Sequence, residues 1–331
     1  MVKVSFIKNV AGINKILSVI FLTCFIACSD EKPPKTKFKE RQKAKFELVQ
    51  TPIVNADSVY GFVLKQVEFG PREPNSKAHE LCGDWMVSKL KAYNFDVVEQ
   101  RGIQVAHDNN KLFYRNVIAR FGKSKKNRIL LSAHWDTRPW ADQDVERTDE
   151  PIDGANDAAS GVAVILEIAR LLNKQEPNIG VDVVLFDIED YGKSNDSFCY
   201  GSQIWSRDTR LDSIKPIYGI NLDMVGDPNA VFMYEGYSMQ YARPILDKVW
   251  NVAKNMGYDR YFTTMQDGMI TDDHYYVNLA GIPCIDIIHR EPSSGGFADT
   301  WHTHQDNMDN ISAKTLQVVT EVVLQTIYRE K

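Results

Sequence analysis

Acidic and histidine side chains recur in five short motifs between residues 134 and 303, in the composition of a metal site. In order, the motifs contain His134, Asp157, the pair Glu189 and Asp190, Asp223, and His302. Each lies where an apolar run ends or beside a glycine-rich turn, and strand ends in an open α/β sheet form ligand-binding crevices. Because no closely spaced cysteine pair lies beyond residue 28, we predict zinc in a site with an open coordination position. Such a zinc would act as a Lewis acid on a carbonyl oxygen.

Ordinary structural roles are available to several of these residues. His134 could satisfy local hydrogen bonds at a strand end, or bind a metal with Asp136 orienting its second ring nitrogen. Asp157 could ligate a metal or cap the helix that follows it.

The acidic pair Glu189 and Asp190 could coordinate a metal with one carboxylate and move protons with the other, or form a solvated turn. Asp223 and Asp272 could share a proton, unless Asp272 or Asp273 serves as a helix cap.

Alternating strands and helices must position these residues. Apolar periodicity predicts helices over 57–67, 76–93, 158–172, 239–256 and 312–328, and a further helix opening at Asp272. Strands are predicted over 96–105, 112–121, 128–135, 181–188, 217–224 and 282–288. Continuous Val, Ile and Leu runs are typical of strands covered on both faces. The predicted fold class is α/β, with a mixed, mostly parallel central sheet flanked by helices on both faces, in a single catalytic domain over 46–331.

The first 45 residues have the pattern of an export signal and a tether. Three lysines precede an apolar run over 16–27, which is too short to span a bilayer. The Ala27-Cys28 junction resembles a bacterial lipobox, which implies cleavage after residue 27 and acylation of Cys28; plain secretion and an uncleaved anchor are the alternatives. Residues 28–45 are predicted to be a flexible tether. We therefore expect a domain that is exported and lipid-anchored to a bacterial envelope membrane, at the periplasmic face or the cell surface.

Charge and cysteine content limit the remaining possibilities. The chain has 39 Lys+Arg and 44 Asp+Glu, and its first 45 residues are rich in lysine, so the remainder is distinctly acidic. Nucleic acid is therefore not an expected partner. Beyond Cys24 and Cys28 there are three cysteines, predicted to be structural, which permit at most one disulfide: Cys82, Cys199 and Cys284. Four histidines are predicted to face solvent: His79, His107, His289 and His304. Polar segments over 138–153, 193–198 and 291–299 are expected to rim the site or to be solvated loops.

The motifs, in this order, resemble the zinc aminopeptidases of the M28 peptidase clan over residues 50–331, and within that clan the glutaminyl cyclases. Trp301 directly before His302, Asp272 beside Asp273-His274, and Ile270 carry the resemblance to the cyclases. This resemblance implies a glutaminyl-peptide cyclotransferase, an acyltransferase. Such an enzyme converts the N-terminal glutamine of peptides or proteins into pyroglutamate and releases ammonia.

The same resemblance implies a role for each matching residue. Asp157, Asp190 and His302 would hold one zinc per chain, although Asp190 stands where most of the clan has glutamate. Glu189 would carry a proton from the α-amine to the leaving ammonia, with Asp223 and Asp272 as hydrogen-bonded partners near the amide. Trp301 would form one wall of the pocket that holds the glutamine side chain, and Ile270 would add an apolar contact to it. The resemblance also implies a second tryptophan in the pocket, for which the candidates are Trp135, Trp140 and Trp205.

His134 matches a position that binds a second metal in the aminopeptidases. Because His134 and Asp223 are both present, a two-zinc aminopeptidase that hydrolyses N-terminal peptide bonds is the alternative. A surface-anchored binding protein with a degenerate enzyme fold is a third possibility. A monomer is expected in each case.

Overall fold

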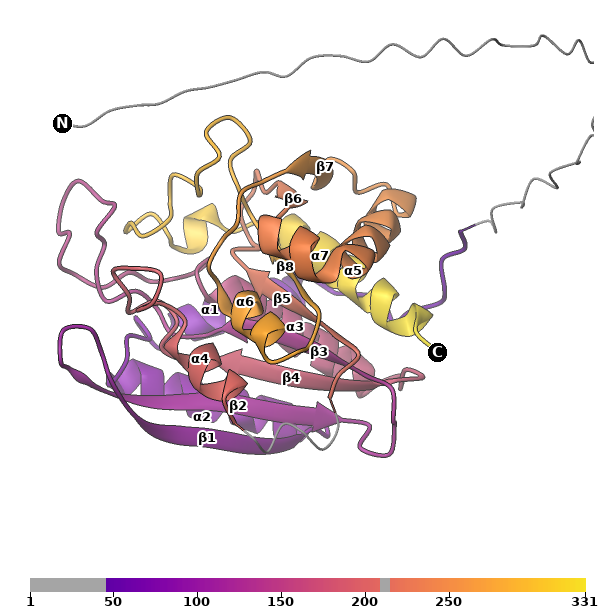
Figure 1. Ribbon diagram of the computed structural model, residues 1–331, viewed down its shortest axis with the longest axis horizontal. Helices are drawn as coiled ribbons and strands as arrows, with labels where there is room; N and C mark the ends of the chain where they lie inside the picture. Colours follow the sequence, from indigo (N-terminus) through magenta and orange to yellow (C-terminus); the bar gives the residue numbers. More distant parts are fainter. Residues whose placement is uncertain (1–45, 209–214) are drawn as a thin grey trace, which may run out of the picture. The chain divides into compact units, whose positions relative to one another are not determined.

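A six-stranded sheet forms the centre of the protein (Figure 1), in the order β1-β2-β4-β3-β5-β8. The computed structural model describes residues 46–208 and 215–331. The predicted signal peptide, Cys28 and the predicted tether lie outside the described residues. Strands β1 and β2 pair antiparallel, as do β2 and β4, whereas β3 pairs parallel with both β4 and β5, and β5 pairs parallel with β8. The strands are β1 (Asp96–Val105), β2 (Lys111–Phe121), β3 (Arg128–His134), β4 (Gly180–Phe186), β5 (Tyr218–Asp223) and β8 (Cys284–Ile288).

Helices cover both faces of this sheet, which confirms the predicted fold class. The main core joins one sheet face to five helices: α1 (Ala56–Val67), α2 (Lys77–Ala92), α3 (Ala159–Leu172), α5 (Gly236–Asn255) and α7 (Ala313–Arg329). A smaller apolar cluster joins the other face to α4 (Tyr200–Ser206) and α6 (Asp273–Leu279). None of the helices in the described part of the chain has both the length and the apolar character needed to cross a bilayer.

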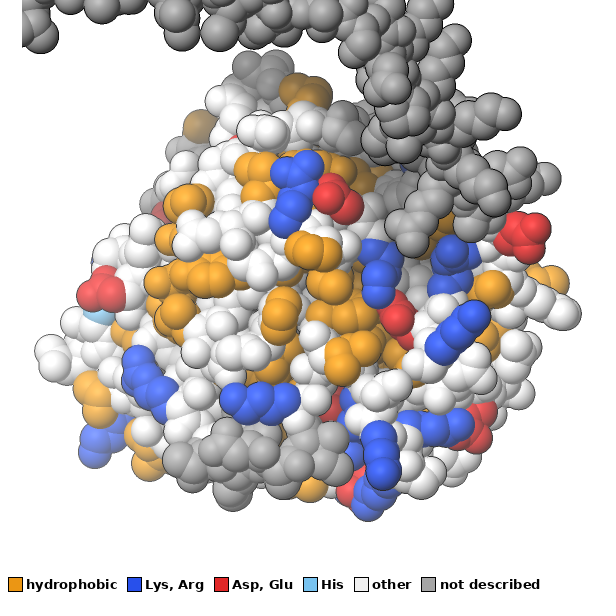
Figure 2. Space-filling model, turned by 45° about the vertical axis from the view of Figure 1, so that its right-hand side comes forward, with side chains coloured by type: hydrophobic (Ala, Val, Ile, Leu, Met, Phe, Trp, Pro, Cys, Tyr) orange, Lys and Arg blue, Asp and Glu red, His pale blue; other side chains and the backbone are white. Residues whose placement is uncertain are grey.

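The long elements agree with the sequence prediction to within a few residues. The exceptions are short: helix α4 and the two-stranded sheet of β6 (Phe232–Tyr234) and β7 (Phe262–Gln266) were not predicted. Strand β4 ends at Phe186, before the predicted end, because the backbone turns into the left-handed region at Ile188, where φ is 50°. On the face drawn in Figure 2, hydrophobic side chains reach the surface between polar and basic ones, as on most protein surfaces.

Helix α3 is the most deeply buried helix, with every residue except Arg170 inside the protein. It can approach the sheet closely because Gly161 has no side chain. A Cβ atom at this position would lie 2.2 Å from the carbonyl oxygen of Leu222 in β5 and 3.0 Å from Cβ of Ala133 in β3. Both strands carry residues of the site, so this contact fixes their distance from α3.

We predict that Gly161→Ala destabilises the protein by roughly 3 kcal/mol, because α3 must move away from β5 to admit the methyl group. Gly61→Ala in helix α1 is the matched control, since nothing lies within 4 Å of a Cβ atom there. It should raise stability by about 0.5–1 kcal/mol through helix propensity. Urea unfolding of both variants measures the difference, and a Gly161→Ala variant as stable as the wild type would contradict the packing argument.

Candidate active site

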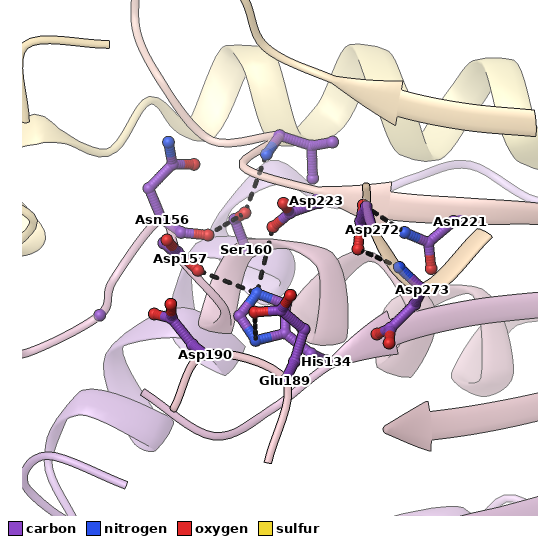
Figure 3. A network of polar contacts seen from close by, with 12 residues as sticks. His134, Asn156, Asp157, Ser160, Glu189, Asp190, Asn221, Asp223, Asp272 and Asp273 are labelled. Atoms are coloured by element: carbon purple, nitrogen blue, oxygen red, sulfur yellow. Dashed lines mark hydrogen bonds and ion pairs between the residues drawn. The ribbon is translucent and has the colours of Figure 1, made fainter. Parts of the chain in front are cut away.

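The ends of three parallel strands deliver the acidic and histidine side chains to one edge of the sheet. His134 is the last residue of β3 and Asp223 the last of β5, while Glu189 and Asp190 follow β4 after the turn at Ile188. Figure 3 shows the carboxylates of Asp157, Asp190, Glu189 and Asp223 gathered around His134. All of these side chains are buried.

Asp157, Asp190 and His302 form one group that fits a zinc ion. His302 Nε2 lies 3.1 Å from Asp190 Oδ1 and 3.8 Å from Asp157 Oδ2. One ligand atom from each residue lies within 4.8 Å of the others, and Asp190 Oδ2 is buried with no hydrogen-bond partner among the described residues. Two carboxylates and an imidazole match a three-ligand zinc site that keeps a position open.

The alternative role of Asp157 as a helix cap is excluded. The N-cap of α3 is Ala158, and no side chain caps this helix. Asp306 instead holds the turn, since its carboxylate accepts hydrogen bonds from the backbone N–H groups of Asn156 and Asp157 at 2.6 and 3.1 Å. The Asp157 carboxylate is thereby left free to bind a metal.

A second group of possible ligands shares Asp157 with the first. His134 Nε2 lies 2.9 Å from Asp157 Oδ1 and 3.2 Å from Asp223 Oδ1. The ligand atoms of His134, Asp157 and Asp223 also lie within 4.8 Å of one another. The donor set of the two-metal alternative is therefore present in the fold.

Asp136 does not orient His134 as the sequence suggested. Its carboxylate lies 3.7 Å from His134 Nδ1, beyond hydrogen-bond distance. It accepts instead from the backbone N–H groups of Glu189 and Asp190, at 3.0 and 3.2 Å. Asp136 therefore holds the turn that carries both members of the acidic pair.

Glu189 and Asp272 place two further carboxylates in the same pocket. One oxygen of each lies within 4.8 Å of the other and of the Cys199 sulfur. Burial, together with Asp190, Asp273 and Asp272, raises the pKa of Glu189 well above its usual value, although His134 acts in the opposite direction. Burial also raises the pKa of Asp223 to about 7. A carboxyl group with the pKa of Asp223 can exchange protons near neutral pH.

Asp272 has two roles in this structure. It is the N-cap of α6, accepting from the backbone N–H of Asp273, and it lines the pocket. Its Oδ2 atom accepts a hydrogen bond from Asn221 Nδ2 at 2.9 Å. The structure shows no hydrogen bond between Asp272 and Asp223; Asp223 Oδ1 instead lies 3.2 Å from His134 Nε2.

Arg138 and Asp142 hold two residues of the first ligand group in place; both belong to the segment 138–153 that was predicted to rim the site, although neither was predicted as a site residue individually. Asp142 Oδ1 lies 3.2 Å from His302 Nδ1. Arg138 donates to Asp142 Oδ2 at 2.6 Å and to the backbone oxygen of Asp190 at 2.8 Å. The Arg138 guanidinium thus connects Asp142, which contacts the His302 ring, to the backbone of Asp190. Supporting contacts of this kind orient metal ligands.

A cavity of about 330 Å³ opens beside these groups. Trp301 and Ile270 line it, as the resemblance implied, and Trp301 stacks on the ring of His302 at 3.7 Å. Apart from the ligands and acids already described, the lining includes Phe198, Phe297, Met269, Asn195 and Arg290. These residues include members of two predicted rim segments, 193–198 and 291–299.

The three candidate tryptophans lie elsewhere. Trp135 is fully buried and stacks on His79, Trp205 belongs to the apolar cluster beneath α4, and Trp140 packs against Tyr191. Besides Trp301, the aromatic side chains that line the cavity are Phe198 and Phe297. The sequence prediction considered tryptophans alone for this role.

Two of the histidines expected at the surface are buried. His79 Nε2 lies 2.7 Å from Asp187 Oδ1, and His289 Nδ1 accepts from the backbone N–H of Val231 at 2.9 Å. His107 is exposed as expected, and His304 is partly buried. Cys82, Cys199 and Cys284 are buried free thiols, so none of them forms a disulfide.

Comparison with known proteins gives a consistent family. The model of peptidase family M28 matches residues 116–327. The glutaminyl cyclase of Bacteroides thetaiotaomicron, solved with N-acetylhistamine, is 46% identical with a TM-score of 0.83, over 85% of this chain and all of that one. A leucine aminopeptidase precursor from the same species is also 46% identical, with a TM-score of 0.82, over 86% of this chain and all of that one. The glutaminyl-peptide cyclotransferase of Drosophila melanogaster is 24% identical, over 74% of this chain and 73% of that protein.

The chain therefore belongs to peptidase family M28, and within that family to the glutaminyl cyclases. The resemblance seen in the sequence is confirmed.

The pKa of His302 gives a pH-dependent prediction. Burial alone would lower this pKa, but Asp190 and Asp142 outweigh burial and raise it from 6.5 to about 9. In the metal-free protein these ion pairs stabilise the fold fully below pH 6.5, and their contribution is lost as the pH rises through 9. Zinc binding requires neutral imidazole and so becomes stronger over the same range.

We therefore expect the increase in Tm on adding zinc to chelator-treated protein to grow between pH 6.5 and pH 9. Differential scanning fluorimetry with and without zinc measures it, and His302→Ala, which lacks the ligand, is the control. An increase in Tm that shrinks over this range would contradict the assignment of His302 as a ligand.

Proposed function

We propose that this protein is a zinc-dependent glutaminyl-peptide cyclotransferase. Its substrates are peptides or proteins with N-terminal glutamine, whose α-amine attacks the side-chain amide carbon to form pyroglutamate and release ammonia. The observation that carries the proposal is the acid pair of Glu189 and Asp272 in one cavity, beside a three-ligand metal site and under the Trp301 wall. Cyclisation requires groups that move protons and hold the amide, and these residues provide them.

The reaction needs little from the protein besides orientation and proton transfer. Because nucleophile and electrophile belong to one residue, holding that residue in a bent conformation supplies much of the acceleration. A cavity lined by Trp301, Ile270 and Phe297 can enclose a single side chain and exclude water from it. Exclusion of water also prevents competing hydrolysis of the amide.

Glu189 is the group that moves the proton. Its raised pKa suits a base that accepts a proton from the attacking α-amine and later gives it to the departing ammonia. One proton leaves one nitrogen and reaches the other, so no external acid or base is consumed. Asp272 lies on the same side of the cavity and can accept a hydrogen bond from the reacting amide.

Asp157, Asp190 and His302 would hold the zinc ion in this proposal. Bound there, zinc supplies a Lewis acid for the carbonyl oxygen of the side-chain amide. Arg138 and Asp142 keep Asp190 and His302 in place.

A two-zinc aminopeptidase is the second candidate function. The specific observation in its favour is the second ligand group, in which His134, Asp157 and Asp223 lie close enough to share an ion. Hydrolysis would then use a water molecule and release free amino acids. The two functions differ in product and in metal content.

We predict that the purified protein converts a peptide starting with glutamine to its pyroglutamyl form, with loss of ammonia, and releases no free residue from a matched peptide starting with leucine. Mass spectrometry of both reactions gives the answer, and elemental analysis should find one zinc per chain. Release of free amino acids together with two zinc ions per chain would establish the aminopeptidase instead.

We predict that Glu189→Gln lowers turnover by roughly 10² to 10⁴-fold, the usual contribution of a positioned acid or base. Glutamine fills the same space but cannot accept the proton. Zinc content should stay unchanged, because Glu189 is not a member of the proposed zinc site, and it is measured on the same samples as the activity. Near-normal turnover in this variant would exclude the role.

We also propose that the enzyme is a monomer held at a bacterial envelope membrane by acylation of Cys28, with substrates reaching it outside the cytoplasm. The support is the lysine-flanked apolar run and the small residue before Cys28. Labelling with a fatty acid in cells, lost in Cys28→Ala, tests the anchor, and light scattering of the purified protein tests the monomer.

A further inference from the structure

Cys199 lies against Glu189 at the start of helix α4. Its thiol is fully buried and donates a hydrogen bond to Glu189 Oε1, with 3.0 Å between sulfur and oxygen. Glu189 Oε2 accepts no hydrogen bond from the described residues, and it lies 3.9 Å from His134 Nδ1. The two oxygens of this carboxylate therefore have different surroundings.

The backbones of the same two segments are also joined. The Cys199 N–H donates to the backbone oxygen of Glu189 at 2.8 Å, and the Tyr200 N–H donates to that of Ile188 at 3.2 Å. Cys199 has a φ of 57°, in the left-handed region, which is strained for a residue with a side chain. Glycine would adopt this conformation without that strain, but it would leave Glu189 Oε1 without its donor.

A thiol is a suitable donor for a carboxylate that must remain basic. Burial and the neighbouring carboxylates raise the pKa of Cys199 well above its usual value, so the group stays neutral and keeps its proton. A lysine or arginine here would pair with Glu189 and lower its basicity. The weak S–H donor can fix one oxygen in place with little effect on the charge.

We propose that Cys199 is a positioning residue for Glu189: its S–H group holds Oε1 so that Oε2 faces the substrate amine. The inference rests on the proposed function, in which Glu189 moves the proton. Cys199 itself touches no reacting atom, and its effect is expected in kcat rather than in KM.

Cys199→Ala should lower kcat for the glutamine peptide about tenfold, the equivalent of one hydrogen bond to a charged group. KM should change less than about twofold, and zinc content should be unchanged. Cys199→Ser, whose hydroxyl can still donate, should recover most of the loss. Cys82→Ala is the matched control, since it removes the same buried group from helix α2, away from the site; it should lower Tm without lowering kcat.

Cys199→Gly separates positioning from folding, because glycine relieves the backbone strain yet provides no donor. This variant should stay folded and lose turnover as Cys199→Ala does. Wild-type turnover of the glutamine peptide is measured alongside, and its absence would overturn both proposals. Undiminished kcat in Cys199→Gly, or equal losses in Cys199→Ser and Cys199→Ala, would overturn the role of Cys199 alone.

Discussion

Burial of several carboxylates in one small volume is the constraint on which this structure depends. Asp157, Glu189, Asp190, Asp223 and Asp272 are each no more than 9% exposed and meet within a single site. Like charges held this close in a poorly solvated place cannot all ionise without compensation. Their negative charge is offset by bound protons, by the imidazoles of His134 and His302 and by the guanidinium of Arg138. The carboxylates and imidazoles also form a donor set that fits a divalent cation. Proton transfer near neutral pH follows from the same crowding.

The turns that carry these residues are shaped by a second layer of buried carboxylates. Asp136 accepts two backbone N–H groups from the turn after β4, and Asp306 accepts two from the turn before α3. Glu235 accepts from Tyr237 and Ser238 at the start of α5, and from Ile270 in the cavity wall. In each case a buried carboxyl group accepts hydrogen bonds from amides that no helix or strand uses, and so satisfies backbone groups that would otherwise be left without a partner. The site is therefore rigid although most of it lies on loops.

The sequence predicted what local pattern encodes. Apolar runs ending in acidic or histidine residues indicated the strands, their shared edge and the ligands, because parallel strands bring their carboxyl ends together. Asp136 was assigned to the neighbouring His134, and Asp306 received no role, because the segments that they hold lie 53 and 149 or 150 residues away in the sequence. Helix α4 and strand β6 are too short for a periodic signal. His79 and His289 were misassigned to the surface because a buried histidine is satisfied by partners, here Asp187 and Val231, that its neighbours in sequence do not reveal.

The choice between one metal and two depends on the protonation of His134. Burial alone would lower its pKa, but Asp136, Asp157 and Asp223 outweigh burial and raise it well above the usual value. A protonated imidazole has no lone pair for a metal, and it brings to Asp157 and Asp223 the positive charge that a second ion would supply. A second ion at His134, Asp157 and Asp223 would have to displace this proton, just as an ion at Asp157, Asp190 and His302 would have to displace the proton of His302. Protons and metal ions therefore compete for both ligand groups, and the metal content of the protein distinguishes the two proposed functions.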